Sequence, residues 1–180
     1  MKILKGLIKK WNIYLENNEY ISQDYIVICS ALNTEELLVP LGHKIFLEPI
    51  LGQVLELELE NKALNWNNWP AILNYENINF IYQNPNHLIM GATIESNTKP
   101  NPLFKKEMLE MKNYAPSWIR NAKIKNEWHG IRAKPINEPA PLLKYLEQGL
   151  LINTGHYRNG ILLAPYCAEW VGLKIDELES

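Results

Sequence analysis

The spacing of apolar residues changes several times along the chain, and each change predicts a different element. Residues 24–31, DYIVICSA, form a continuous apolar run rich in β-branched side chains, which is typical of a strand buried on both faces. Residues 32–38 then predict a short helix. From Ile3 to Leu15 apolar residues recur three or four positions apart, which predicts an amphipathic helix that packs on its own domain rather than on a membrane surface.

The middle of the chain has strand-like patterns. Residues 52–60, GQVLELELE, alternate apolar and acidic side chains, which indicates a strand with one solvated face. Residues 78–83 and 87–95 are two further apolar runs separated by the turn residues Asn-Pro-Asn, so they predict an antiparallel hairpin. A helical pattern follows from 103 to 114, and residues 122–135 predict a strand that leaves this region.

The last part of the chain returns to an α/β pattern. Residues 149–154, GLLINT, predict a strand, and a helix is predicted from residue 161 to near the end. The expected fold is therefore a mixture of α/β and α+β. Its first and last parts belong to an α/β layer, and its middle forms an antiparallel or mixed β-sheet.

Composition narrows the classes of partner and compartment. The formal net charge is −2 over 180 residues and the basic residues are scattered, so we expect no nucleic-acid partner. No stretch is long and apolar enough to span a bilayer, and we expect no membrane partner. Cys29 and Cys167 lie far apart in apolar runs, which predicts buried, reduced thiols in a cytoplasmic protein. The four histidines match no metal motif, so no metal site is predicted.

Two segments could bind an anion. Residues 155–160, GHYRNG, lie between a predicted strand and a predicted helix, where unpaired backbone N–H groups and the helix dipole favour negative charge. Residues 128–135, WHGIRAKP, contain Arg132, whose guanidinium is suited to a bidentate grip on a carboxylate. A tight turn with an exposed Arg158, and a surface arginine on a strand, are the alternatives that the residues alone leave open.

Five segments carry motifs in one collinear order: DYIVICSALNTEELL (24–38), PILGQVLEL (49–57), HLIMGATIE (87–95), WHGIRAKP (128–135) and GHYRNGILLAP (155–165) followed by AEWV. This ordered set resembles the flavin-dependent glycine oxidase branch of the D-amino-acid oxidase family. The resemblance implies a Rossmann-like FAD domain interrupted by a substrate domain. It assigns residues 1–44 and 129–180 to a partial FAD-binding domain and residues 45–128 to a β-rich substrate lobe.

The resemblance also implies a function and a site. The function is oxidation of glycine or another small amino acid or amine by FAD, which in bacteria supplies glycine imine for the thiazole of thiamine. Arg132, Arg158 and Tyr82 would be catalytic, and Arg132, Arg158 and Phe80 would bind the substrate. The flavin ring would lie against Gly155, His156, Tyr157, Arg158, Asn159, Gly160 and Ile161.

The chain departs from the family pattern at several points. No Gly-x-Gly-x-x-Gly occurs in its 180 residues, so the adenine and pyrophosphate site is missing. Ala133 stands where the family has proline, and Phe80 replaces a tyrosine, with Tyr82 two residues on. We therefore predict a truncated enzyme or one half of a split enzyme, whose partner would be a complementary N-terminal FAD-domain chain. The alternatives are a non-catalytic remnant that binds a small carboxylate or a protein partner, and a folding remnant that is unstable alone.

Overall fold

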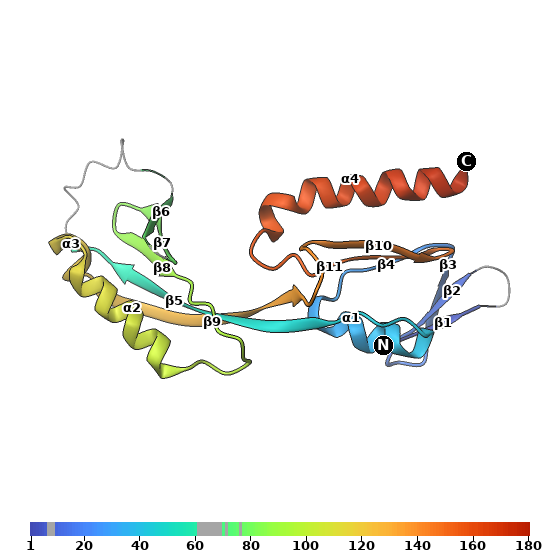
Figure 1. The fold of residues 1–180 in the computed structure, drawn as a ribbon, viewed down its shortest axis with the longest axis horizontal. Helices are drawn as coiled ribbons and strands as arrows, with labels where there is room; N and C mark the ends of the chain where they lie inside the picture. Colours follow the sequence, from blue (N-terminus) through green and yellow to red (C-terminus); the bar gives the residue numbers. More distant parts are fainter. Residues whose placement is uncertain (7–9, 61–69, 71, 76) are drawn as a thin grey trace. The chain divides into compact units, whose positions relative to one another are not determined.

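The computed structural model describes all residues except 7–9, 61–69, 71 and 76. The chain divides into two compact units (Figure 1). Unit 1 comprises Met1–Pro49 and Arg132–Ser180, and unit 2 comprises Ile50–Ile131. Two long strands, β5 (Leu47–Glu58) and β9 (Lys123–Pro135), contain residues of both units.

The described residues of unit 1 form two three-stranded sheets. In the first, β1 (Lys2–Lys5), β2 (Trp11–Tyr14) and β3 (Tyr20–Gln23) form an antiparallel meander. In the second, β11 (Leu150–Thr154) is central, with β10 (Leu142–Glu147) antiparallel on one side and β4 (Ile26–Ile28) parallel on the other. Its helices are α1 (Thr34–Leu38), the 3-10 turns Ala31–Asn33 and Val39–Leu41 on either side of α1, and the 20-residue α4 (Gly160–Glu179).

The core of unit 1 explains this arrangement. Helix α4 lies along one face of the β10–β11–β4 sheet, and α1 lies on the opposite side (Figure 1). The buried core lies between this sheet, α1 and the meander. Strand β11 is the most buried strand of the sheet, because it has a strand on each side and other elements pack on both of its faces. The core residues are Ile3, Trp11, Ile26, Ile28, Leu38, Ile45, Leu142, Leu150 and Ile152.

The predicted N-terminal helix is wrong: strands β1 and β2 occupy this region. Ile3 pairs with Ile13 across the hairpin, and Ile3 and Trp11 are both buried in the unit 1 core. The Trp11 indole N–H also donates to the backbone carbonyl of Gln148, 3.0 Å away. Packing against the core therefore overrides a spacing that a helix would also satisfy. Leu7 and Ile8, which contributed to the helical pattern, lie outside the described residues.

Unit 2 is an antiparallel sheet with helices on one face. The strand order is β6 (Ile72–Tyr75), β7 (Ile78–Asn84), β8 (His87–Gly91), β5, β9. The predicted hairpin is confirmed by β7 and β8, in which Phe80 pairs with Met90. Helix α2 (Pro102–Tyr114) and the short α3 (Ser117–Arg120) pack on the face that buries Leu55, Leu57, Phe80, Leu88 and Met90. The mixed α/β fold predicted from the sequence is therefore present.

Candidate functional site

The loop of residues 155–160 is fixed at its start and in its middle by contacts within unit 1. At its start, the Thr154 hydroxyl lies 3.2 Å from the Thr34 hydroxyl, and both residues are buried. In its middle, the backbone N–H of Tyr157 donates to the carbonyl of Ala133 on β9, at 3.2 Å. This bond holds the loop beside the strand position that follows Arg132, so the two segments predicted to bind an anion lie together.

Gly155 has a conformation and a packing that require glycine. Its φ is +63°, in the left-handed region. A Cβ at this position would lie 2.8 Å from Cγ of Pro135 and 3.2 Å from Cδ2 of Leu47. The absence of a side chain therefore allows β9 and β5 to approach the loop. Tyr157, with φ +53°, is also left-handed, which gives the loop its tight curvature.

Helix α4 begins at Gly160 with an open N-terminus. The side chain of Asn159 caps no backbone N–H, and the first turn contains no acidic residue. The first N–H groups of a helix have no partner within the helix, and the helix dipole places partial positive charge there. Ile161 in this turn is 97% exposed. The start of α4 can therefore stabilise negative charge on a ligand beside the loop.

Arg132 contains an unpaired donor. Its side chain is half-buried, and its Nη1 atom is buried without a hydrogen-bond partner among the described residues. Burial, and next the positive charge of Arg158, lower the pKa of the Arg132 guanidinium, while Tyr157 opposes this shift. A buried guanidinium N–H without a partner is costly, and a carboxylate is its natural acceptor.

Of the cationic side chains described beside the loop, Arg132 and Arg158 remain available to a ligand. Lys134 is already engaged: its ammonium donates to the carboxylate of Glu48 and lies 5.9 Å from the centre of the Tyr157 ring. Arg158 is exposed on the loop. Arg132, Arg158 and the start of α4 thus form an electropositive site in unit 1, suited to a carboxylate and to a second electron-rich group.

The remaining predicted residues fall in different places. His156 and Tyr157 are half-buried and Asn159 is exposed, all on the loop. Phe80 and Tyr82 lie on β7 in unit 2. Phe80 is 4% exposed and belongs to the core beneath α2. The substrate and flavin contacts assigned to these residues stay predictions.

Sequence reasoning missed the residues that support the site. The Thr34–Thr154 contact and the Lys134–Glu48 pair join residues 120 and 86 positions apart. No local pattern around Thr34 or Glu48 signals these contacts, because each depends on which strands are neighbours. Pro135 was visible only as the end of a motif, and its role in excluding a side chain at Gly155 required the fold.

The two cysteines differ in burial, and the described residues contain neither a candidate metal site nor a helix that could span a membrane. Both cysteines are free, and Cys167 is buried, but Cys29 is exposed because it follows β4 where the strand ends, so its predicted burial is wrong. Among the described residues no group of three His, Cys, Asp or Glu could hold a metal ion. No described helix has the length and apolar character needed to cross a bilayer.

Comparisons with known proteins decide the family. The family model described as "FAD dependent oxidoreductase" matches residues 5–172. The chain belongs to this family. Two glycine oxidases, from Pseudomonas putida KT2440 and Pseudomonas aeruginosa PAO1, are each 25% identical to this FAD-dependent oxidoreductase family member over 153 residues. Each match covers 81% of this chain and 40% of the relative.

Solved structures show the same fold. Glycine oxidase from Geobacillus kaustophilus superimposes with a TM-score of 0.80 at 21% identity, covering 95% of this chain and 46% of that one. Iminodiacetate oxidase from Chelativorans sp. BNC1 gives a TM-score of 0.79 at 18% identity, covering 93% of this chain and 46% of that one. This family member therefore spans less than half the length of each of these four relatives.

The residues present fit one end of FAD. An uncapped helix start and a buried, unpaired guanidinium N–H lie in one unit and offer donors to an electron-rich ring and to a substrate carboxylate. For the pyrophosphate, the fold would need a glycine-rich strand-to-helix turn, and the sequence contains no Gly-x-Gly-x-x-Gly. The fit is therefore limited to the ring end of the cofactor.

Proposed function

We propose that this chain supplies the carboxylate-binding and flavin-ring part of an enzyme that oxidises glycine or another small amino acid. The observation that supports this most strongly is Arg132, whose buried Nη1 has no partner among the described residues beside a loop and a helix start that favour negative charge. The choice of glycine, and with it the supply of glycine imine for the thiazole of thiamine and a cytoplasmic location, is supported by the resemblance to glycine oxidases.

Each residue has a distinct task in this proposal. Arg132 binds the substrate carboxylate and so orients the α-carbon, while Arg158 adds a second positive charge on the same side. The start of α4 would stabilise the negative charge that a bound flavin ring acquires when it accepts the electrons of the amine. The roles assigned to Phe80 and Tyr82 stay predictions, and the side chain of Phe80 is buried in the unit 2 core. When bound, FAD would accept the two electrons lost by the amine as its imine forms.

We propose that the rest of the enzyme comes from polypeptide outside these 180 residues, either a separate N-terminal FAD-domain chain or a longer form of this protein. The share of the relatives that the chain spans supports this. So does the outward face of α4, where Ile161, Leu162, Tyr166 and Leu173 are 97%, 78%, 60% and 63% exposed. Strand β4 also pairs only with β11 among the described strands, which leaves one edge of that sheet open.

Two measurements test the proposal in order. Gel filtration after incubation with FAD, followed by an absorbance spectrum, asks whether the chain retains flavin; retention followed by bleaching with glycine supports a complete site. Calorimetry with glycine and glycolate then tests the carboxylate site, which Arg132→Ala should abolish. Arg120→Ala is the matched control, because Arg120 lies in α3 of unit 2. Carboxylate binding that is unchanged in Arg132→Ala would refute the assignment.

A second function is favoured by the same guanidinium. If the missing half does not exist, the chain is a non-catalytic protein that binds a small carboxylate through Arg132 or a protein partner through α4. Saturable glycolate binding without flavin retention, even after a candidate N-terminal half is added, would identify this case. Retention of FAD by the two halves together would exclude it.

A further inference from the structure

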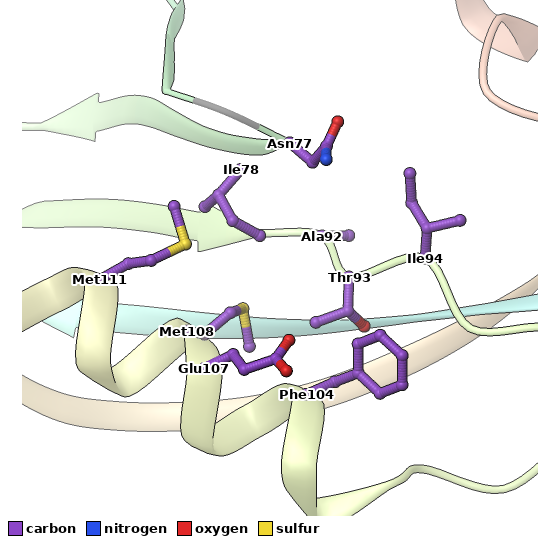
Figure 2. Close-up of a pocket in the computed structure, with 9 residues that line it drawn as sticks. All are labelled: Asn77, Ile78, Ala92, Thr93, Ile94, Phe104, Glu107, Met108 and Met111. Carbon is purple, nitrogen blue, oxygen red and sulfur yellow. The ribbon is translucent and has the colours of Figure 1, made fainter.

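Unit 2 contains a pocket that the proposed oxidation does not use. It lies between α2, the start of β7 and the segment that follows β8, and it has a volume of about 190 Å³ (Figure 2). By liquid volume this equals about six water molecules, so a ligand of about five non-hydrogen atoms would fit. The lining residues are Asn77, Ile78, Ala92, Thr93, Ile94, Phe104, Glu107, Met108 and Met111.

The inner wall of the pocket is apolar. Ile78 is 6% exposed and Met108 1%, and both belong to the unit 2 core. The Met111 side chain points toward Ile78, and the Phe104 ring stands on the other side of the opening (Figure 2). Thioether and aromatic groups are polarizable, and an aromatic face attracts cations. This wall can therefore bind a short apolar chain next to a positive charge.

Glu107 is the only titratable residue among the described lining residues, and its carboxylate extends toward the pocket (Figure 2). No hydrogen bond or ion pair of this carboxylate occurs in the described part of the chain. The lysines of α2 are engaged elsewhere: Lys105 pairs with Glu127, Lys106 with Glu110, and the Lys112 ammonium donates to the Arg120 carbonyl. Glu107 is exposed to solvent, and no described cation pairs with its negative charge.

The other polar groups do not favour an anion. The Thr93 hydroxyl donates to the buried carboxylate of Glu95 and accepts the backbone N–H of Gln53, 2.8 Å away, so its one donor is not available to an anion. Asn77 contributes an amide at the rim, whose oxygen can accept from an ammonium group. The lining side chains thus provide one free negative charge and no positive charge.

We propose that this pocket binds a small organic cation: a primary ammonium group attached to a short alkyl chain. The ammonium pairs with Glu107 and can donate to the Asn77 amide oxygen, while the alkyl chain lies against Ile78, Met108 and Met111. For a ligand of this size the dissociation constant is in the millimolar range. The site is confined to unit 2, and it does not depend on flavin or on Arg132.

The test uses the full chain labelled with ¹³C at the methionine methyl groups. Of the four methionines, Met108 and Met111 line the pocket. Titration with butylammonium should shift these two methyl signals saturably. Butyramide, which has a similar shape without charge, should bind at least fivefold more weakly, and butyrate should not bind. Equal affinity for butyramide, or shifts confined to the other two methionines, would overturn the proposal.

Variants on one helix separate charge from structure. Glu107→Gln should weaken butylammonium binding at least fivefold, whereas Glu110→Gln, one turn along α2 and already paired with Lys106, should leave it unchanged. Equal losses in both variants would contradict a specific ion pair. The wild-type protein gives a second measurement that needs no variant: added NaCl should weaken butylammonium binding, and binding that is independent of salt would refute the proposed pairing.

Discussion

Of the two glycines that bound the 155–160 loop, Gly155 should tolerate alanine poorly and Gly160 should tolerate it well. Gly155→Ala places an L-residue at φ +63°, which costs about 1–2 kcal/mol. Its Cβ would also lie 2.8 Å from Pro135 Cγ, and a contact of this kind adds about 1–3 kcal/mol because strand and loop must separate. The expected loss in free energy of unfolding is about 3 kcal/mol, which lowers Tm by about 6–12 °C in a chain of this size.

Gly160→Ala is the matched control. Its nearest neighbour would be Cβ of His156 at 3.5 Å, an ordinary contact, and its position is the first of α4. Alanine favours helix over glycine, so we expect a change of about 0.5 kcal/mol or less, or a slight stabilisation. Thermal unfolding followed by circular dichroism measures both variants. If Gly155→Ala is as stable as Gly160→Ala, the inferred packing of the loop against Pro135 is wrong.

Three further predictions concern stability and association. Ala31 has φ +49°, so Ala31→Gly should raise the free energy of unfolding by about 1 kcal/mol, whereas Ala164→Gly in exposed α4 should lower it by about 1 kcal/mol; urea denaturation should give these opposite signs. The pKa of Glu147 is lowered chiefly by its hydrogen bond from Lys5, so the contribution of this carboxylate to the free energy of unfolding is fully present above pH 4.5 and is lost as the pH falls through the lowered pKa. Glu147→Gln should therefore make the free energy of unfolding fall less steeply with acid. An unchanged dependence on pH would contradict this. Leu162→Glu with Leu173→Glu should reduce concentration-dependent association in light scattering without changing Tm, and unchanged association would show that this face of α4 is not responsible.

The sequence predicted those elements whose pattern is local. The predicted helix is confirmed at Pro102–Tyr114. It was predictable because its start signals are local: Asn101 caps it and proline occupies its first turn. The β7–β8 hairpin is confirmed because a polar turn separates two apolar runs. The N-terminal meander was missed because its apolar residues fit a helix equally well. Strand is favoured over helix only because Trp11 packs in a core formed largely by residues distant in the sequence.

The candidate site was predictable in its residues but not in its assembly. Arg132 and the 155–160 loop were identified from motifs, and the hydrogen bond from Tyr157 to Ala133 brings them together. The unpaired Nη1 of Arg132 could not be predicted, because it depends on which side chains lie around the end of β9. Glu107 gave no signal in the sequence, since only the ion pairs of the neighbouring lysines show that it is left without a cation.

The outward face of α4 has a consequence for how fast this protein is degraded in a cell. Ile161, Leu162 and Leu173 expose apolar surface of the kind that chaperones and proteases recognise. A polypeptide that covers this face would also protect the protein from degradation. The cellular amount of this protein would then depend on the amount of the covering polypeptide more than on this protein's own rate of synthesis. Deleting the gene for a true partner should therefore shorten the half-life of this protein.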